Sequence, residues 1–107
     1  MDACTPTCAA PSPAVFIVVP AFNEARLIAE TLRDVPAWVR GVVVVDDASQ
    51  DSTAARVQRV GDPRINLVRH RANQGVGAAI RTGYAHAFAR GADIAVAVYA
   101  RAREEAR

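Results

Sequence analysis

Residues 41–53 read GVVVVDDASQDST, and this stretch decides the fold class. Its four consecutive valines show no polar alternation, which is typical of a strand buried on both faces, as in parallel sheets. Asp46 and Asp47 follow at once, where such a strand would end. Adjacent carboxylates at this place are costly unless they face water or contact a ligand. The stretch therefore predicts both a buried parallel strand and a candidate site at its carboxyl end.

Strand and helix signals alternate on both sides of this stretch. Upstream, residues 15–19 form an apolar run that Pro20 is expected to end, and residues 24–35 carry apolar side chains at helical spacing. The elements predicted downstream are a helix carrying Ala54, Val57 and Val60 inward and ended by Gly61, a strand over 65–69, a helix over 76–90, and a strand over 93–98. This βαβαβαβ order predicts an α/β fold: a Rossmann-like parallel sheet of about four strands with flanking helices.

The last predicted helix is rich in small residues. Its expected inward face consists of Val76, Ala79, Ile80, Gly83 and Ala87. Alanine and glycine at those positions would allow the helix to approach the sheet closely.

Composition excludes several classes of function. The chain has 107 residues, which allows one domain, and 51% of them are hydrophobic, which favours a globular fold. A net charge of +2 is too small to argue for nucleic acid or an anionic membrane. All 13 basic residues are arginine, so a Schiff-base or P-loop lysine is excluded. The apolar runs are far shorter than the roughly 20 residues of a membrane span, so a cytoplasmic location is expected.

The chain divides into three segments by composition. Residues 1–13 are expected to be a disordered leader, residues 14–98 the folded domain, and residues 99–107 a polar tail. Cys4 and Cys8 lie in the leader with no second pair, so a redox or metal role is the less favoured interpretation.

The carboxyl ends of parallel strands meet at one edge of a sheet, where ligands bind. Residues 20–24, 46–51 and 70–75 and whatever follows Val98 should therefore face one crevice. In the first of these, Asn23 can cap a helix and Glu24 suits its positive N-terminus; an ordinary strand-to-helix turn is the alternative. The acidic pair can bind a base or ribose with one carboxylate and hold the loop with the other. Its alternative is an Asx turn, with Ser49 or Asp51 capping the next helix.

The third segment, residues 73–79, reads NQGVGAA. Its glycines let backbone N–H groups approach an anion at a helix N-terminus. As a dinucleotide fingerprint it is weak, because Ile80 replaces the third glycine and the motif follows the third strand. The basic run 69–71 could attract a diphosphate or could simply be a solvated loop.

Together and in this order, residues 18–24, 44–53, 73–84 and 91–94 resemble the first half of family 2 glycosyltransferases, which have the A-type Rossmann-like fold. Within that family, the residues of these motifs are most similar to those of the polyprenyl-phosphate hexose synthase branch, the dolichyl-phosphate mannose synthase-like enzymes. The resemblance implies that residues 14–98 are the half of the domain that binds a nucleotide diphosphate sugar. The residues it places in that pocket are Pro20, Ala21, Asn23, Glu24, Asp46 or Asp47, Asn73 and Gly75.

The chain departs from the family after its fourth strand. There the family carries an Asp-x-Asp motif that holds Mg²⁺ or Mn²⁺, whereas this chain places Tyr99 and Arg101 at those positions. Neither side chain is a ligand for a hard cation. The family's second half is also missing, so no catalytic residue is predicted. The fourth strand would be an exposed apolar edge open to self-association, which favours a truncated or frame-shifted product.

The predicted function is that of a glycosyltransferase-family domain. Intact relatives would transfer a hexose to an acceptor such as a polyprenyl phosphate, in some cases at a membrane surface, and this chain alone would be inactive. The alternative is a non-catalytic nucleotide-binding remnant or interaction module. A phospho-receiver domain is disfavoured, because the acidic pair follows the second strand, no aspartate ends the third, and lysine is absent.

Overall fold

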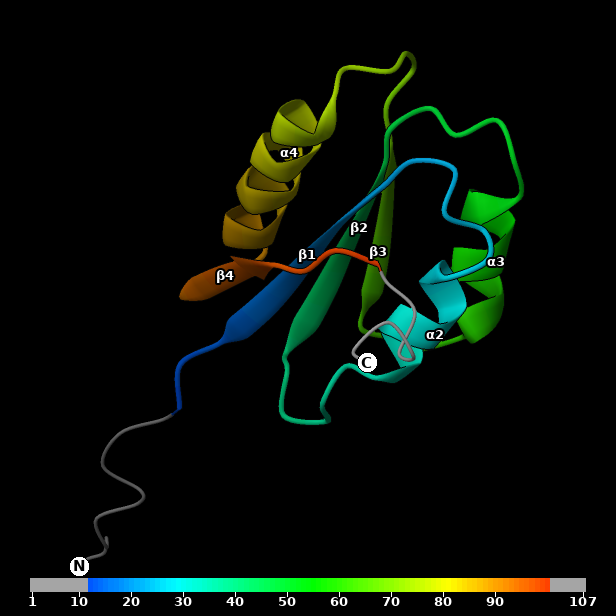
Figure 1. Ribbon diagram of the computed structural model, residues 1–107. Coiled ribbons are helices and arrows are strands. Elements are labelled where there is room, and N and C mark those ends of the chain that lie inside the picture. The colour runs from blue at the N-terminus through cyan, green and yellow to red at the C-terminus, as the bar shows by residue number, and fades with distance from the viewer. Residues whose placement is uncertain (1–11, 101–107) are drawn as a thin grey trace, which may run out of the picture.

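The computed structural model describes residues 12–100 as a parallel four-stranded sheet with helices on both faces (Figure 1). The predicted α/β class is confirmed. The elements are, in chain order, β1 (Val15–Ala21), α2 (Ile28–Arg33), β2 (Gly41–Asp46), α3 (Thr53–Val60), β3 (Ile65–Arg69), α4 (Val76–Ala89) and β4 (Ile94–Ala97). Cys4, Cys8 and Arg101 lie outside the described residues, and the three-segment division of the chain stays a prediction.

The strand order is β3-β2-β1-β4, and every pairing is parallel. At the centre, Val18 of β1 pairs with Val43 of β2 on one side and with Ala97 of β4 on the other. The chain builds outward from β1 to β3, and α4 then carries it back to β4 on the far side of β1 (Figure 1). The strand order therefore reverses between β1 and β4, and a crevice at the carboxyl ends of such strands is the usual ligand site.

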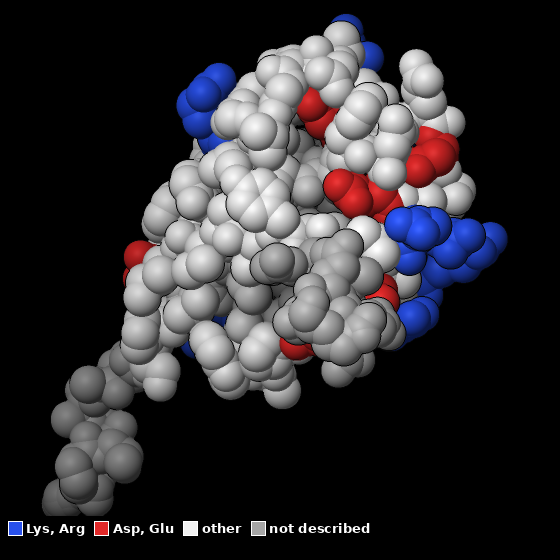
Figure 2. Space-filling view, in the orientation of Figure 1, with Lys and Arg blue, Asp and Glu red and all other residues white. Residues whose placement is uncertain are grey.

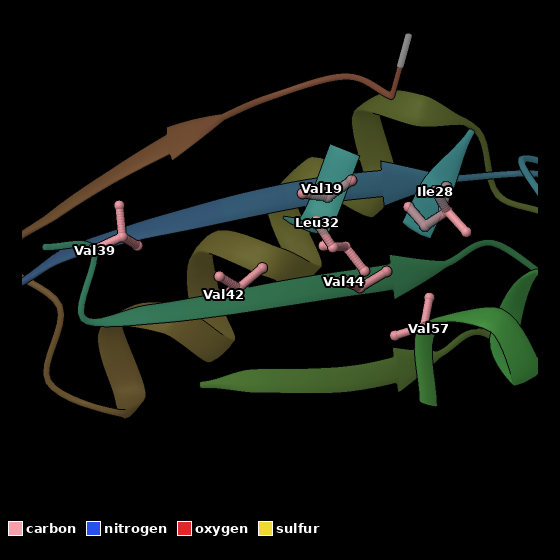
Figure 3. Packing of buried hydrophobic residues seen from close by; sticks show 8 residues of the cluster. Val19, Ile28, Leu32, Val39, Val42, Val44 and Val57 are labelled. Carbon is pink, nitrogen blue, oxygen red and sulfur yellow. The ribbon is translucent and has the colours of Figure 1, made fainter. Parts of the chain in front are cut away.

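The two central strands are buried because both of their faces are covered. Val19, Val42 and Val44 pack against Ile28 and Leu32 of α2 and Val57 of α3 (Figure 3). The alternate residues of the same strands, which include Val18, Val43 and Val45, pack against Ala79 and Ala87 of α4. Each fully buried valine of this kind stabilises the fold by about 1.5–3 kcal/mol relative to an exposed one.

Helix α4 approaches the sheet more closely than an ordinary helix could. A Cβ atom at Gly83 would lie 2.2 Å from Cγ1 of Val18 on β1, so only glycine fits there without movement. Ala79, Gly83 and Ala87 are buried, as predicted, and Ile80 is half-buried. The prediction for Val76 was wrong: its side chain is 55% exposed, because it lines the open cavity at the carboxyl end of the sheet and does not pack on the strands.

Strand β1 does not end at Pro20, as predicted, but continues to Ala21. The absence of an N–H group at Pro20 is tolerated because that group would point toward β4, which has already ended there. The carbonyl of Val18 accepts a hydrogen bond from Val98 on the β4 side, so Pro20, two residues on, faces the same side. Strand β4 has already ended at Ala97, and no ladder partner is lost.

Helix α2 is shorter than the predicted helix over 24–35. Residues 25–27 form turns, in which the N–H groups of Leu27 and Ile28 both donate to the carbonyl of Glu24, and the helix begins at Ile28. The N–H groups of Glu24 and Ala25 donate to the side chains of Thr53, the first residue of α3, and of Asp51. The helix ends at Arg33, before Pro36. The other elements start or end within one residue of their predicted limits.

Strand β4 is an edge of the described sheet, as expected. Ile94 and Val96 are each 45% exposed on it. Self-association through this edge stays a prediction. Among residues 12–100, no helix has the length and apolar character needed to cross a bilayer.

Candidate functional site

A cavity of about 430 Å³ opens at the carboxyl end of the sheet, at the switch between β1 and β4. Segments distant in the sequence meet there: the end of β1, the loop after β2, the start of α4 and the residue two positions after β4. The lining consists of Pro20, Ala21, Phe22, Glu24, Asp47, Asn73, Gly75, Val76, Ala79 and Tyr99.

The cavity combines a polar part with an apolar rim. Glu24, Asp47 and Asn73 supply oxygen and amide groups, while the rings of Phe22 and Tyr99 are 45% and 54% exposed. Figure 2 shows acidic side chains gathered over the loops at the carboxyl ends of the strands, with arginines beside helices α2 and α3. A pocket with a few convergent polar groups among apolar and aromatic side chains is typical of small-molecule sites.

Asp47 is the polar centre of this end of the sheet. Its Oδ1 accepts hydrogen bonds from Nδ1 of His70 at 2.8 Å and from the N–H of Gln74 at 2.9 Å. Its Oδ2 accepts the N–H of Gly75 at 2.8 Å. Burial alone would raise the pKa of Asp47, but these hydrogen bonds outweigh it and lower the pKa below its usual value of 3.8. Asp47 is therefore an anion that ties the β3–α4 loop to the end of β2.

Asp46 has a different role from its neighbour. It is fully buried, and its Oδ1 accepts the N–H of Ser49 at 3.0 Å, which shapes the loop after β2. Its Oδ2 lies 3.3 Å from Nε of Arg69 on β3, an ion pair without hydrogen-bond geometry. Because Asp46 ends the strand and Asp47 leaves it, only Asp47 reaches the cavity.

The β1–α2 and β2–α3 loops are joined by reciprocal hydrogen bonds. The N–H of Asn23 donates to Oγ of Ser49 at 2.9 Å, and Oδ1 of Asn23 accepts the N–H of Gln50 at 2.9 Å. Asn23 adopts a left-handed backbone conformation, φ 54°, which asparagine tolerates better than most residues. Ala48, at φ 63°, has no such preference, so the loop after β2 holds some strain.

A second connection between these loops runs through Thr53. Its Oγ1 accepts the N–H of Glu24 at 2.9 Å and donates to Oδ1 of Asp51. Oδ1 of Asp51 also accepts the N–H of Thr53, two residues on, which is the Asx turn given as the alternative. The N-cap residue of α3 is Ser52, which makes no side-chain capping hydrogen bond, and Ser49 bonds the β1–α2 loop instead, so the predicted cap by Ser49 or Asp51 was wrong. Burial opposes ionisation of Asp51, but these hydrogen bonds lower its pKa below 3.8.

Glu24 is the second carboxylate of the cavity. Burial, and then the charge of Asp51, raise the pKa of Glu24 above its usual value of 4.5. Ionisation of Glu24 is thus disfavoured in the free protein, and a ligand that donates hydrogen bonds to its oxygens would relieve that cost.

Six of the eight predicted site residues line the cavity: Pro20, Ala21, Glu24, Asp47, Asn73 and Gly75. Asn23 and Asp46 do not line it and instead accept hydrogen bonds from backbone N–H groups of the β2–α3 loop. The basic run 69–71 does not line the cavity: Arg69 pairs with Asp46, His70 is buried, and Arg71 is exposed. Sequence reasoning missed Phe22, although it lies inside the first motif, and gave no structural role to His70 or Thr82.

The described residues after β4, 98–100, carry no side chain that suits a divalent cation. Tyr99 lines the cavity and Ala100 follows it, so this strand end presents a phenol and a methyl group where a hard cation needs carboxylate or carbonyl oxygens. Within residues 12–100, no group of three acidic, histidine or cysteine side chains is arranged to hold a metal ion.

Comparison with known proteins gives a consistent result. The family model for glycosyl transferase family 2 matches residues 16–97. The chain is 27% identical over 97 residues to a UDP-N-acetylglucosamine–dolichyl-phosphate N-acetylglucosaminyltransferase of Methanococcus voltae, covering 77% of this chain and 39% of the relative. It is 33% identical over 82 residues to a dolichyl-phosphate beta-glucosyltransferase of Trichomonas vaginalis, covering 64% of this chain and 24% of the relative.

A solved structure shares the fold as well as the sequence pattern. The mannosyltransferase PcManGT of Pyrobaculum calidifontis, in complex with GDP-Man and Mn²⁺, matches with a TM-score of 0.65 and 35% identity. The match covers 71% of this chain and 25% of that structure. The chain therefore spans between about a quarter and two fifths of the length of these relatives.

Proposed function

Since the chain belongs to glycosyl transferase family 2, we propose that the cavity at the carboxyl end of its sheet binds a nucleotide diphosphate sugar. The observation that carries this proposal is the convergence of Glu24, Asp47 and Asn73 with two aromatic rings in one cavity of about 430 Å³. That volume lies within the range of pockets for ligands of this size. The complex of the matching mannosyltransferase with GDP-Man supports the same ligand class.

Each part of the ligand has a complementary part of the cavity. The exposed rings of Phe22 and Tyr99 offer apolar faces for a planar base. Glu24 can accept hydrogen bonds from ribose hydroxyls, which would also offset the cost of its ionisation. Gly75 is the N-cap of α4 and supplies no side-chain cap, and the N–H groups of the first turn, from Val76 on, suit a diphosphate.

Of the two adjacent aspartates, Asp47 is the one we assign to the base or ribose, because it lines the cavity and Asp46 does not. A carboxylate offers about four lone-pair positions. Two hydrogen bonds end on Oδ1 of Asp47 and one on Oδ2, so Oδ2 retains an accepting position for a ligand. Asp47 would thus hold the loop and contact the nucleotide at once.

For the family reaction, we propose that a phosphate oxygen of a lipid-phosphate acceptor attacks the anomeric carbon while the nucleotide diphosphate leaves. The dolichyl-phosphate names of two relatives support this acceptor class. The 107-residue chain alone is proposed to bind the donor without transferring its sugar, because the strand end that should carry the family's metal ligands presents Tyr99. A non-catalytic nucleotide-binding module is therefore the second candidate function.

Titration calorimetry tests the binding proposal. The chain is titrated with UDP-glucose and with GDP-mannose, with and without Mn²⁺. Binding of at least one donor, unchanged by Mn²⁺, is the expected result. Glu24→Gln should weaken it, whereas Glu30→Gln on α2, outside the cavity, should not. The absence of binding by a chain with a folded spectrum would refute the proposal.

A transfer assay separates the two candidate functions. Donor and a polyprenyl phosphate are incubated with the chain, and the glycolipid is measured by mass spectrometry. We expect none to form. Sugar transfer by the 107-residue chain would show that it is an enzyme by itself.

A further inference from the structure

His70 is a buried side chain that connects two elements of the site without lining the cavity. Its side chain is 8% exposed, and Nδ1 lies 2.8 Å from Oδ1 of Asp47. Its other ring nitrogen, Nε2, lies 2.9 Å from Oγ1 of Thr82 on α4. Its backbone N–H donates to the carbonyl of Asp46 at 2.9 Å, which fixes the start of the β3–α4 loop.

The partners of His70 determine where its ring carries a proton. The Asp47 carboxylate can only accept, and it also accepts two backbone N–H groups, so Nδ1 must be the donor. If the ring is neutral, Nε2 accepts the hydroxyl proton of Thr82; if it is charged, Nε2 donates to that oxygen instead. Nδ1 carries a proton in both cases.

Thr82 is itself held in place by the packing of α4. The next residue, Gly83, lies so close to Val18 of β1 that a Cβ atom would come within 2.2 Å of it. This contact fixes the position of the helix on the sheet and with it the distance from Thr82 to His70. A continuous set of contacts thus runs from the core through Thr82 and His70 to Asp47.

The far end of this set of contacts is the cavity wall. Asp47 accepts the N–H groups of Gln74 and Gly75, and its carbonyl accepts Nδ2 of Asn73 at 3.3 Å. Asn73 and Gly75 both line the cavity. Any movement of the Asp47 carboxylate would therefore move this loop.

We propose that His70 is a positioning residue, which through its Nδ1–H and its contact with Thr82 holds Asp47 and the loop 73–75 in the geometry that binds the nucleotide. The affinity part of this inference rests on the proposed function. The proton assignment and the order of the loop do not, and they are tested without any ligand.

The first test is nitrogen-15 NMR of the ligand-free chain. We expect Nδ1 of His70 to be protonated, with a slowly exchanging downfield N–H signal. A ring protonated only at Nε2 would overturn the proposal, whether or not the chain binds a nucleotide sugar.

The second test compares Thr82→Val with Thr82→Ser. Valine keeps the shape of threonine but removes the hydroxyl, whereas serine retains it. We expect Thr82→Val to speed amide exchange at Gln74 and Gly75 by about tenfold, the equivalent of one hydrogen bond, and Thr82→Ser to leave it within about twofold of wild type. Unchanged exchange in Thr82→Val would overturn the proposal.

Nucleotide titration of the same two variants completes the design. Weaker binding by Thr82→Val with wild-type binding by Thr82→Ser supports the positioning role, and equal affinities contradict it. If the wild-type chain binds no nucleotide sugar, the proposed function fails, and the exchange and NMR results still decide the role of His70.

Discussion

The two ends of the sheet are held together in different ways. At the amino end, Arg64 pairs with Asp62, two residues away, at 2.7 Å, and its Nη1 donates to the carbonyls of Pro36 and Val39. Both side chains of this pair are 23% exposed. At the carboxyl end, Asp47 and His70 are separated by 23 residues in the sequence and are 4% and 8% exposed.

The difference between the two ends shows how one fold provides both a stable structural end and a ligand site. The ion pair at the amino end is local and partly exposed, so it forms with little loss of chain entropy and tolerates water, and it holds Arg64 where it can also bond the backbone before β2. The carboxyl end relies on buried polar groups that are satisfied only when three distant loops meet. Such groups are costly if one partner is missing, so they specify the loop geometry that a ligand requires.

The largest expected effect is that of Asp47→Ala. It leaves His70 and the N–H groups of Gln74 and Gly75 without their acceptor, so we expect a loss of about 3 kcal/mol in the free energy of unfolding. Asp62→Ala at the more exposed amino-end pair should cost about 1 kcal/mol or less. Urea unfolding measures the free energy of unfolding that each variant loses. Equal losses would contradict the difference proposed between the two ends of the sheet.

The pH dependence of these variants follows from the same contacts. Folding lowers the pKa of Asp47, so its contribution is complete above its usual value of 3.8 and is lost as the pH falls through the lowered pKa. Asp62 behaves alike, with its pKa lowered by Arg64. Asp47→Asn should therefore lose less stability than wild type between about pH 4 and pH 2.

A pair of glycine substitutions separates stability from binding. A Cβ atom would lie 2.2 Å from Val18 at Gly83, and 2.5 Å from the ring of Phe16 at Gly41. Gly83→Ala and Gly41→Ala should each cost about 2 kcal/mol of stability. Only Gly83→Ala, which displaces α4, should also weaken nucleotide binding in calorimetry. Weakened binding by Gly41→Ala at the amino end would contradict this separation.

A smaller effect is expected from a new charge at the cavity. Val76 is exposed in the first turn of α4 and lines the cavity. Val76→Arg should tighten binding of a nucleotide diphosphate sugar by roughly fivefold, the equivalent of about 1 kcal/mol for an exposed ion pair. Binding of the nucleoside without its diphosphate should stay the same. Equal tightening of both ligands would place the diphosphate elsewhere.

The smallest effect concerns the stability of the free protein. Folding raises the pKa of Glu24, so its ionised form opposes folding above the usual value of 4.5, and the penalty fades as the pH falls through the raised pKa. Glu24→Gln should slightly raise the urea midpoint at neutral pH while weakening nucleotide binding. A lower midpoint would show that the carboxylate stabilises the free protein.

Much of the fold follows from the sequence because the valine run and the helical periodicities are strong local signals. The residues 41–46 and 65–69 form strands essentially as predicted. The helix at residues 28–33 was predicted too long, because residues 25–27 form turns that the apolar spacing of this segment does not indicate.

The site was predictable as a location but not as a set of contacts. Strand ends indicated which loops meet, but no local pattern could assign Asp46 to the interior and Asp47 to the cavity. That assignment depends on where β2 stops relative to β1. The sequence around His70 is typical of an exposed basic loop. Its side chain is buried because α4 packs beside it, where Thr82 contacts its ring.

Pro20 has one further consequence for the chain beyond β4. Because Pro20 presents no N–H on the β4 side of β1, a strand that runs alongside loses one hydrogen bond of its ladder at this residue. A neighbouring strand on this side of β1 therefore cannot continue a complete hydrogen-bond ladder past Pro20. Strand β4 ends at Ala97, the N–H of Val98 still donates to the carbonyl of Val18, and Tyr99, one residue further, lines the cavity. The one backbone position of β1 that lacks a donor on this side thus lies where the chain leaves the sheet for the cavity.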